Sequence, residues 1–170
     1  MSPPDLVLMG VTGTGKSTIG SALALELGVP FIDADSLHPR SNVDKMSAGI
    51  PLTDEDREPW LDIVGALLAN AEKGLVVACS ALKRAYRERI TGRAPNVTFI
   101  HLIVSDTELA RRLTGRAGHF MPASLLMSQL ETLEPLGLDE NGFAVAGGSD
   151  PAEVVAAIKE RLGEIPSTAA

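Results

Sequence analysis

The sequence predicts an α/β fold of three layers, in which a parallel five-stranded sheet is covered by helices on both faces. Five short apolar runs alternate with six longer amphipathic segments along the 170 residues. Strands that are separated by helices are joined by right-handed crossovers and therefore run parallel. Hydrophobic residues make up 45% of the chain and aromatic residues only 4%. We therefore expect a single domain, residues 1–170, with an aliphatic core.

The individual elements follow from apolar periodicity and from residues that begin or end helices. Gly28 ends the first amphipathic segment, Ser105 and Glu108 form a capping-box pattern, and Pro151 suits a first helical position. We expect strands at residues 6–9, 30–32, 75–79, 98–103 and 143–146. We expect helices at residues 16–27, 54–72, 81–90, 106–113, 123–133 and 152–162.

Two regions interrupt this alternation. Residues 36–54 and 115–122 are rich in polar residues, glycine and proline, which favours functional loops. Ligands of parallel α/β sheets bind beyond the carboxyl ends of the strands, and both regions lie near such ends. We therefore expect a substrate flap at about 36–60 and a lid at about 112–124. We expect a disordered tail at 164–170.

Composition restricts the class of protein. The net charge of −7, from 15 basic and 22 acidic residues, argues against a nucleic-acid partner, which requires a basic face. A single cysteine, Cys79, leaves no internal disulfide and fits a reducing compartment. The N-terminal residues lack the basic segment of a signal peptide, and no apolar stretch approaches the ~20 residues that span a bilayer. We expect a cytoplasmic protein without a membrane partner.

The first apolar run leads into the stretch GVTGTGKS, which matches the phosphate-loop pattern G-x-x-x-x-G-K-[ST] at every fixed position. In such loops backbone N–H groups and a helix N-terminus bind phosphate oxygens. The lysine bridges the β- and γ-phosphates, and the hydroxyl of the next residue ligates Mg²⁺. A glycine-rich turn without a ligand would explain one or two glycines, but not the lysine–hydroxyl pair. The predicted ATP-binding residues are Gly10, Val11, Thr12, Gly13, Thr14, Gly15, Lys16, Ser17 and Thr18.

Two carboxylates end the second apolar run. Asp33 and Asp35 are two residues apart and leave a strand on the same face. One could hold the water shell of Mg²⁺ while the other accepts a hydrogen bond from an attacking hydroxyl. Alternatively, Asp35 or Ser36 caps the following segment. Beside a phosphate loop we favour the catalytic interpretation; His38 is either a substrate contact or a turn residue.

Basic side chains follow at two further places. Lys83 and Arg87 are four residues apart on an expected helix, and could bind a carboxylate together, whereas Arg84 and Arg89 are expected in solvent. Arg112 and Arg116 are also four apart, and their guanidinium groups suit phosphate oxygens. Alternatively, Arg112 and Arg116 belong to a solvated, basic helix end that complements the helix dipole. We assign Arg111 to such a helix end. Trp60 is interpreted as an anchor of the core or flap.

These motifs together resemble the gluconokinase family, small phosphate-loop kinases related to shikimate and adenylate kinases. The resemblance rests on the stretches GVTGTGKS, DADSLHPRSNVDKMSAGIPLTDEDREPWL, ACSALKRAYRERI and RAGHFMPASLLMSQLETLEP. It implies a nucleoside-monophosphate-kinase-like fold, phosphorylation of D-gluconate to 6-phosphogluconate by MgATP, and a homodimer. It also implies sites near substrate, metal or lid for Asp33, Asp35, His38, Arg57, Lys83, Arg87, Arg112, Arg116 and His119.

The resulting hypothesis is an ATP:gluconate phosphotransferase. Lys16, Asp35 and Arg116 are the expected catalytic residues, and Arg112 contributes to the ATP site. The expected substrate contacts are Asp35, His38, Arg57, Lys83, Arg87 and His119; the expected metal ligands are Ser17 and, through water, Asp33. A shikimate kinase and a non-catalytic ATP-binding regulatory module are the alternatives. The paired aspartates and a second site of basic residues for an anion argue against the regulatory module, since a protein that only senses ATP does not need a second anion-binding site.

Overall fold

A computed structural model describes residues 3–114 and 123–165. Its sheet has five parallel strands in the order β2-β3-β1-β4-β5. Residues Leu6 of β1, Val76 of β3 and Thr98 of β4 are aligned across the three central strands. The strands are β1 (Leu6–Met9), β2 (Phe31–Asp33), β3 (Val76–Ala78), β4 (Thr98–Ile103) and β5 (Gly142–Ala146). The expected parallel five-stranded sheet is confirmed.

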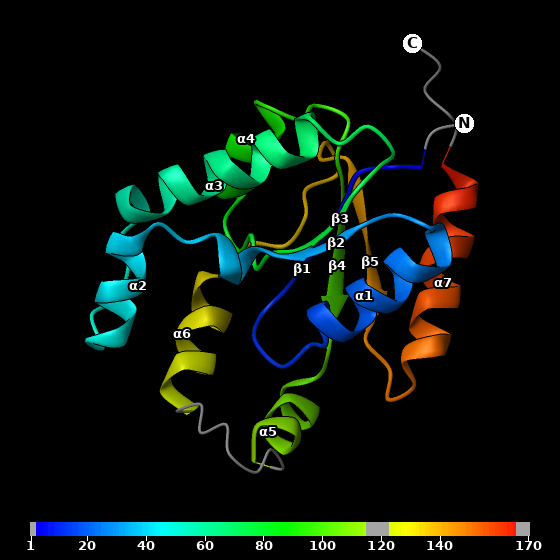
Figure 1. The fold of residues 1–170 in the computed structure, drawn as a ribbon. Coiled ribbons are helices and arrows are strands. Elements are labelled where there is room, and N and C mark those ends of the chain that lie inside the picture. The colour runs from blue at the N-terminus through cyan, green and yellow to red at the C-terminus, as the bar shows by residue number, and fades with distance from the viewer. Residues whose placement is uncertain (1–2, 115–122, 166–170) are drawn as a thin grey trace.

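Helices cover both faces of this sheet. Helices α1 and α7 pack side by side on one face, and α3 and α4 on the other (Figure 1). The α-helices are α1 (Lys16–Leu27), α2 (Arg40–Ser47), α3 (Asp54–Ala69), α4 (Arg84–Thr91), α5 (Asp106–Thr114), α6 (Ala123–Thr132) and α7 (Pro151–Glu164). A 3₁₀ helix, η1 (Ala34–Leu37), follows β2 directly. The three-layer α/β fold is therefore as expected.

The core divides into two aliphatic layers because side chains alternate along each strand. In β1, Val7 packs beneath α3 and α4, whereas Leu8 packs beneath α1 and α7. A smaller cluster lies at the end of the sheet, where Val11 contacts Leu109 and Leu126 of α5 and α6. The fold thus places α5 and α6 next to the loop that follows β1.

Local sequence signals account for several helix ends. Gly28 adopts φ 68°, and its N–H reaches the last carbonyls of α1; Asp150 caps α7, with Pro151 in the first turn. Thr53 and Asp56 form a complete capping box at α3. At α5 the expected box is half formed: the Glu108 N–H donates to Ser105 Oγ at 3.3 Å. The Glu108 side chain pairs instead with arginines of its own helix.

Three expected boundaries are corrected. The region 36–54 is not wholly irregular, because it contains the end of η1 and helix α2. The helix expected from residue 81 begins at Arg84, since Ala81 has a positive φ of 43° that a right-handed helix cannot include. Helix α3 ends at Ala69, earlier than expected. Residues 115–122 and 166–170, within the expected lid and tail, lie outside the described residues.

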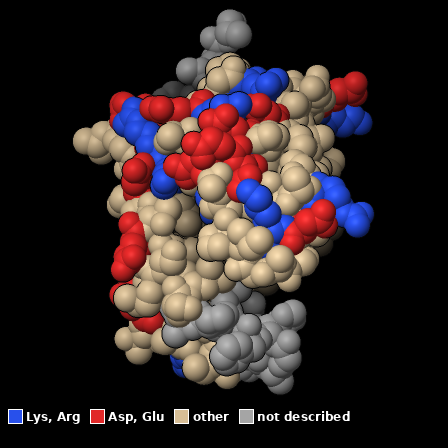
Figure 2. Space-filling view, turned by 90° about the vertical axis from the view of Figure 1, so that its left-hand side faces the viewer, with Lys and Arg blue, Asp and Glu red and all other residues tan. Residues whose placement is uncertain are grey.

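Charged side chains on the face that carries α2 are mixed in sign. Lysine and arginine lie interspersed with aspartate and glutamate over its upper part (Figure 2). Arg40 pairs with Asp44, and Lys45 with Asp56. Positive charge on this face is therefore matched locally. Within residues 3–114 and 123–165, no helix has both the length and the apolar character needed to cross a membrane.

Candidate active site

The phosphate loop leaves β1 and enters α1. Gly10 has a φ of 143°, and a Cβ there would lie 2.9 Å from the Leu102 carbonyl oxygen, so the loop requires glycine at its start. The Lys16 ammonium donates to the Val11 carbonyl at 3.0 Å. Desolvation lowers the pKa of Lys16, an effect that the nearby Asp35 carboxylate opposes. The geometry therefore holds the lysine inside the loop, beside the two acidic residues.

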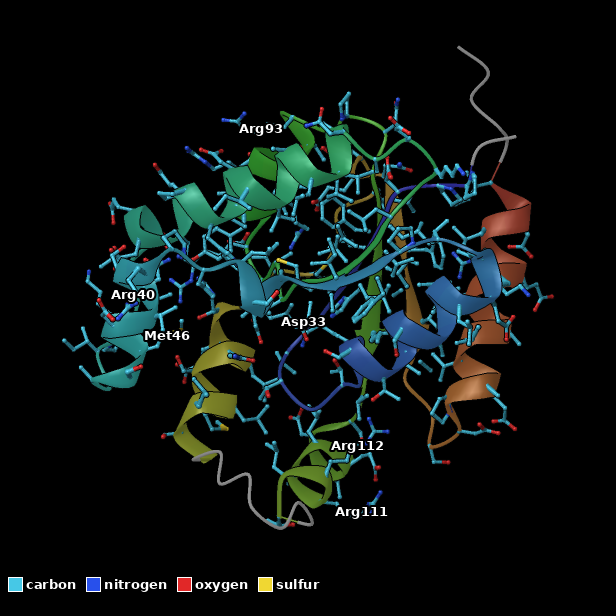
Figure 3. The ribbon with its side chains drawn as sticks, viewed as in Figure 1. Asp33, Arg40, Met46, Arg93, Arg111 and Arg112 are labelled. Atoms are coloured by element: carbon cyan, nitrogen blue, oxygen red, sulfur yellow. The ribbon has the colours of Figure 1, made fainter. Side chains whose placement is uncertain are left out.

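Ser17 and the carboxylate of Asp33 lie in contact at the start of α1 and the end of β2. The Ser17 hydroxyl donates to Asp33 Oδ2 at 2.5 Å, and Figure 3 shows Asp33 between these elements. Asp33 also caps η1, because its Oδ1 accepts the Asp35 N–H at 3.0 Å. The capping alternative thus applies to Asp33, and neither Asp35 nor Ser36 is the cap.

The carboxyl group of Asp35 faces the same site. Desolvation, followed by the neighbouring Asp33 carboxylate, raises the pKa of Asp35, although the residue is exposed at the open face. A carboxylate with a raised pKa is a better proton acceptor near neutral pH. The two aspartates therefore differ in chemistry: Asp33 is engaged in hydrogen bonds, and Asp35 is suited to receive a proton.

The donor set around Ser17 suits a hard divalent cation. A hydroxyl and a carboxylate oxygen are the ligands that Mg²⁺ accepts, alongside water and phosphate oxygens. Among the described residues, no three His, Cys, Asp or Glu side chains are grouped to hold a metal without other ligands. A cation at Ser17 and Asp33 would thus take its remaining ligands from nucleotide and water.

The flap is anchored by an aromatic stack. The rings of His38 and Trp60 lie 4.3 Å apart, and Trp60 Nε1 donates to the Ala34 carbonyl at 2.7 Å. Asn42, which is buried, contacts His38 Nδ1 at 3.3 Å and donates to the Asp56 carbonyl at 2.8 Å. Desolvation lowers the pKa of His38, so its ring is neutral at pH 7. Trp60 is the flap anchor that the sequence indicated.

A second polar cluster joins the start of α3 to α4. Lys83 Nζ donates to the Asp54 carboxylate at 2.9 Å, and the Tyr86 hydroxyl donates to the same carboxylate at 2.5 Å. Arg57 lies 3.8 Å from Asp54 and 5.7 Å from the centre of the Tyr86 ring. Two cations and a phenol therefore surround one carboxylate.

Arg87 does not belong to this cluster, which corrects the expected pairing with Lys83. Lys83 is the N-cap of α4 with extended backbone, so the four-residue spacing does not place the two side chains on one helix face. Arg87 is buried, with 1% of its side chain exposed, and pairs with Glu140 at 2.6 Å. It also donates to the Ala81 and Leu82 carbonyls. These contacts lie inside the fold, and Arg87 does not line the cleft at the phosphate loop.

The remaining basic residues of this segment, Arg84 and Arg89, form ion pairs at the surface, and the neighbouring Cys79 is buried. Arg84 and Arg89 are partly exposed and form ion pairs with Asp139 and Asp62. Cys79 is buried in β3's continuation, and burial raises the pKa of its thiol to about 12. The thiol is therefore protonated and unreactive, as the sequence indicated.

Helices α5 and α6 contact the phosphate loop from two sides. Arg112 donates to the carbonyls of Gly13 and Gly148, both at 3.1 Å, and Gln129 accepts the Thr12 N–H at 2.6 Å. Arg112 points toward the loop whereas Arg111 points away (Figure 3), as expected for Arg111. Arg112 thus supports the loop through a carbonyl. The expected residues Arg116 and His119 lie outside the described residues.

One open cleft of about 1310 Å³ brings most of these groups together. The expected site residues that line it are Thr12, Gly13, Gly15, Lys16, Ser17, Thr18, Asp33, Asp35, His38, Arg57 and Lys83. Val11 and Thr14 are buried behind the loop surface. The lining residues that sequence reasoning missed include the polar side chains of Asp54, Tyr86, Ser128 and Gln129. No helical spacing could have linked Tyr86 to Lys83, because Lys83 precedes α4, and no sequence signal pointed to Gln129.

Comparisons with known proteins agree with this geometry. A family model for shikimate kinase matches residues 12–136. A gluconokinase of Gluconobacter oxydans is 51% identical, with 89% of this chain and 86% of the relative covered. The thermosensitive gluconokinase of Escherichia coli is 46% identical, with 82% and 76% covered. A solved gluconokinase of Sinorhizobium meliloti has a TM-score of 0.83 at 46% identity, over 95% of this chain and 97% of that one.

The fold and the phosphate loop define a small P-loop kinase of the shikimate kinase type. A shikimate kinase of Aquifex aeolicus, 19% identical, shares this fold with a TM-score of 0.61 over 94% of this chain and 96% of its own. Within that class, the identities of 51% and 46% over most of the chain decide the family. This chain belongs to the gluconokinase family, and the resemblance inferred from its motifs is confirmed.

Proposed function

We propose that this protein transfers the γ-phosphoryl group of MgATP to the terminal hydroxyl of D-gluconate, forming 6-phosphogluconate and ADP. The observation that carries the proposal is the cleft itself. A phosphate loop and a carboxylate pair line one part of it, and Arg57 and Lys83 line another. An ATP-dependent kinase for a sugar acid needs both parts: one for the phosphates and one for a carboxylate.

The residues suggest a division of roles. Asp35 accepts the proton of the attacking hydroxyl as the new P–O bond forms and the bond to the β-phosphate oxygen breaks. Lys16 and the loop N–H groups neutralise the charge on the phosphates. Ser17 and, through water, Asp33 would hold Mg²⁺, which would supply positive charge to the phosphates. Arg116 and His119 are proposed to approach from the lid, and His38 to contact the sugar from the flap.

A panel of acceptors in a coupled ADP-release assay tests the function. We expect gluconate to exceed glucose in kcat/KM on the order of 10³-fold or more, because glucose leaves the cations of the cleft without a carboxylate. Equal kcat/KM for the two sugars would exclude the assignment. The shikimate kinase family model makes shikimate the second candidate, and nucleoside monophosphates complete the panel. Nucleotide binding without ADP release for any acceptor would indicate the regulatory module.

Membership of the family also leads us to propose that the protein is a cytoplasmic homodimer. We propose that its kinase activity depends on Mg²⁺. Light scattering coupled to size-exclusion chromatography measures the mass, for which we expect twice the 17.8 kDa of one chain. A mass of one chain at micromolar concentration would contradict the dimer. Chelation of divalent cations should abolish turnover and leave the fold intact.

A further inference from the structure

The Asp54 carboxylate lies where two cations and a phenol converge. Lys83 and Tyr86 each donate a hydrogen bond to it, at 2.9 and 2.5 Å, and Arg57 lies 3.8 Å away. These hydrogen bonds and charges lower the pKa of Asp54, so the group is a carboxylate at neutral pH. All four residues line the same cleft as the phosphate loop.

Tyr86 and Arg57 are less exposed than the Asp54 carboxylate that they surround. Tyr86 is buried, with 7% exposure, and Arg57 is fixed by donating to the Leu52 carbonyl at 2.8 Å. The Asp54 side chain is 53% exposed and occupies the first position of α3. Lys45–Asp56, the ion pair on the same flap, differs because Asp56 also completes the capping box. Asp54 has no such part in the helix end.

We propose that Arg57, Lys83 and Tyr86 form the receptor for the carboxylate of the acid substrate, and that Asp54 occupies this receptor until the substrate displaces it. The inference rests on the proposed function and adds two residues to it: Tyr86 as a hydrogen-bond donor to substrate, and Asp54 as an internal competitor. It is an exchange of one carboxylate for another, with no bond made or broken covalently.

The exchange explains how an acidic protein selects an acidic substrate. Figure 2 shows that the blue cations over the upper part of this face have acidic neighbours, and within the cleft Arg57 and Lys83 are both paired with Asp54. A substrate carboxylate can replace Asp54 and keep both cations paired. A neutral sugar cannot, because it would have to separate Asp54 from its partners without providing a charge in return. The arrangement therefore has two effects: it binds sugar acids, and it rejects neutral sugars.

The test compares Asp54→Asn with Glu55→Gln. Both substitutions remove one negative charge from the first turn of α3, but Glu55 does not line the cleft. We expect Asp54→Asn to lower the gluconate KM, and its Kd measured by calorimetry without ATP, by about threefold to tenfold. Glu55→Gln should leave both near the wild-type values. A gluconate KM in Asp54→Asn that equals the control or exceeds the wild type would overturn the proposal.

Tyr86→Phe provides a second, opposite readout. If the phenol donates to substrate, this variant should raise the gluconate KM about tenfold; if it serves only to hold Asp54, the KM should fall as in Asp54→Asn. Thermal melting checks that each variant is folded. Failure of the two proposals is distinguishable: a wild type that does not phosphorylate gluconate contradicts the function. An active wild type with the wrong order of variants contradicts only the exchange.

Discussion

The two aspartates at the end of β2 show how neighbouring carboxylates acquire different environments. Asp33 accepts hydrogen bonds from the Ser17 hydroxyl and from the Asp35 N–H. Asp35 is next to that negative charge and is desolvated in the cleft, and both effects raise its pKa. Asp35 is therefore the better proton acceptor of the two, whereas Asp33 is engaged with Ser17 at the start of α1.

We predict that Asp35→Asn lowers kcat by about 10²- to 10⁴-fold, the range of general-base contributions, with nucleotide affinity nearly unchanged. Asp33→Asn should instead raise the Mg²⁺ concentration needed for half-maximal activity. Ser36→Ala, on the same 3₁₀ helix, is the control and should keep the wild-type kcat. Wild-type turnover in both aspartate variants would limit the pair to a structural role.

Asp35→Asn, which should lower kcat, should raise the stability of the fold at neutral pH. The pKa of Asp35 is raised in the folded state, so folding favours its protonated form. Its contribution to stability is full below the unfolded pKa and is lost as the pH rises through the folded pKa. At pH 7 Asp35→Asn should thus raise the melting temperature, by about 4 °C at most, since solvent screens this exposed group. The gain should disappear in acid.

Residue roles could be predicted from sequence where a motif fixes the backbone. The phosphate loop is such a case, because its glycines and lysine act through local geometry. The roles of Lys83 and Arg87 could not be predicted in this way, because a four-residue spacing places two side chains on one face only if both residues lie within one helix. Lys83 precedes α4 with an extended backbone, and Arg87 found a buried partner 53 residues away in Glu140. Partners at that separation leave no local pattern.

The ion pair between Arg87 and Glu140 holds helix α4 to the segment before β5. Its contribution to stability can be tested by substitution. We predict that Arg87→Met lowers the free energy of unfolding by about 3 kcal/mol, because Glu140 would keep a buried charge without a partner. Arg84→Met is the matched control on the same helix. Its pair with Asp139 is exposed, so the loss should stay below about 1 kcal/mol. Urea titration measures both. An unchanged stability with a raised gluconate KM would restore the ligand role of Arg87.

Continuously apolar strands, and a helix bounded by the phosphate loop and Gly28, were predicted well, whereas the polar helix α2 was not. Strands β1 and β4 and helix α1 have the expected bounds. Helix α2 was missed because its few apolar residues, Val43 and Met46, are exposed. Its stability comes from tertiary contacts of Asn42 and Lys45 with Asp56 in α3. A sequence window that covers only α2 cannot contain that information.

On the scale of the whole molecule, the cleft is assembled from segments that are distant in sequence. The loop after β1 is contacted by Arg112 of α5 and by Gln129 of α6, while the flap forms another wall. Helices α5 and α6 flank residues 115–122, where the sequence predicts the lid. Movements of these helices would therefore be transmitted directly to the backbone that binds phosphate.

Three arginines of this region should consequently give three different results. Arg116→Ala should lower kcat by about 10³-fold, the contribution of an arginine that neutralises a transferring phosphoryl group, with a modest change in gluconate KM. Arg112→Ala should mainly raise the KM for ATP, because it removes support from the Gly13 carbonyl. Arg111→Ala is the control: its side chain is 71% exposed and, among the described residues, pairs with Glu108 of α5, so activity should be retained. Steady-state kinetics separates the three. An undiminished kcat in Arg116→Ala would indicate that Arg116, like Arg111, is a solvated basic residue. The charge of the transferring phosphoryl group would then be neutralised by Lys16 and the backbone N–H groups of the phosphate loop.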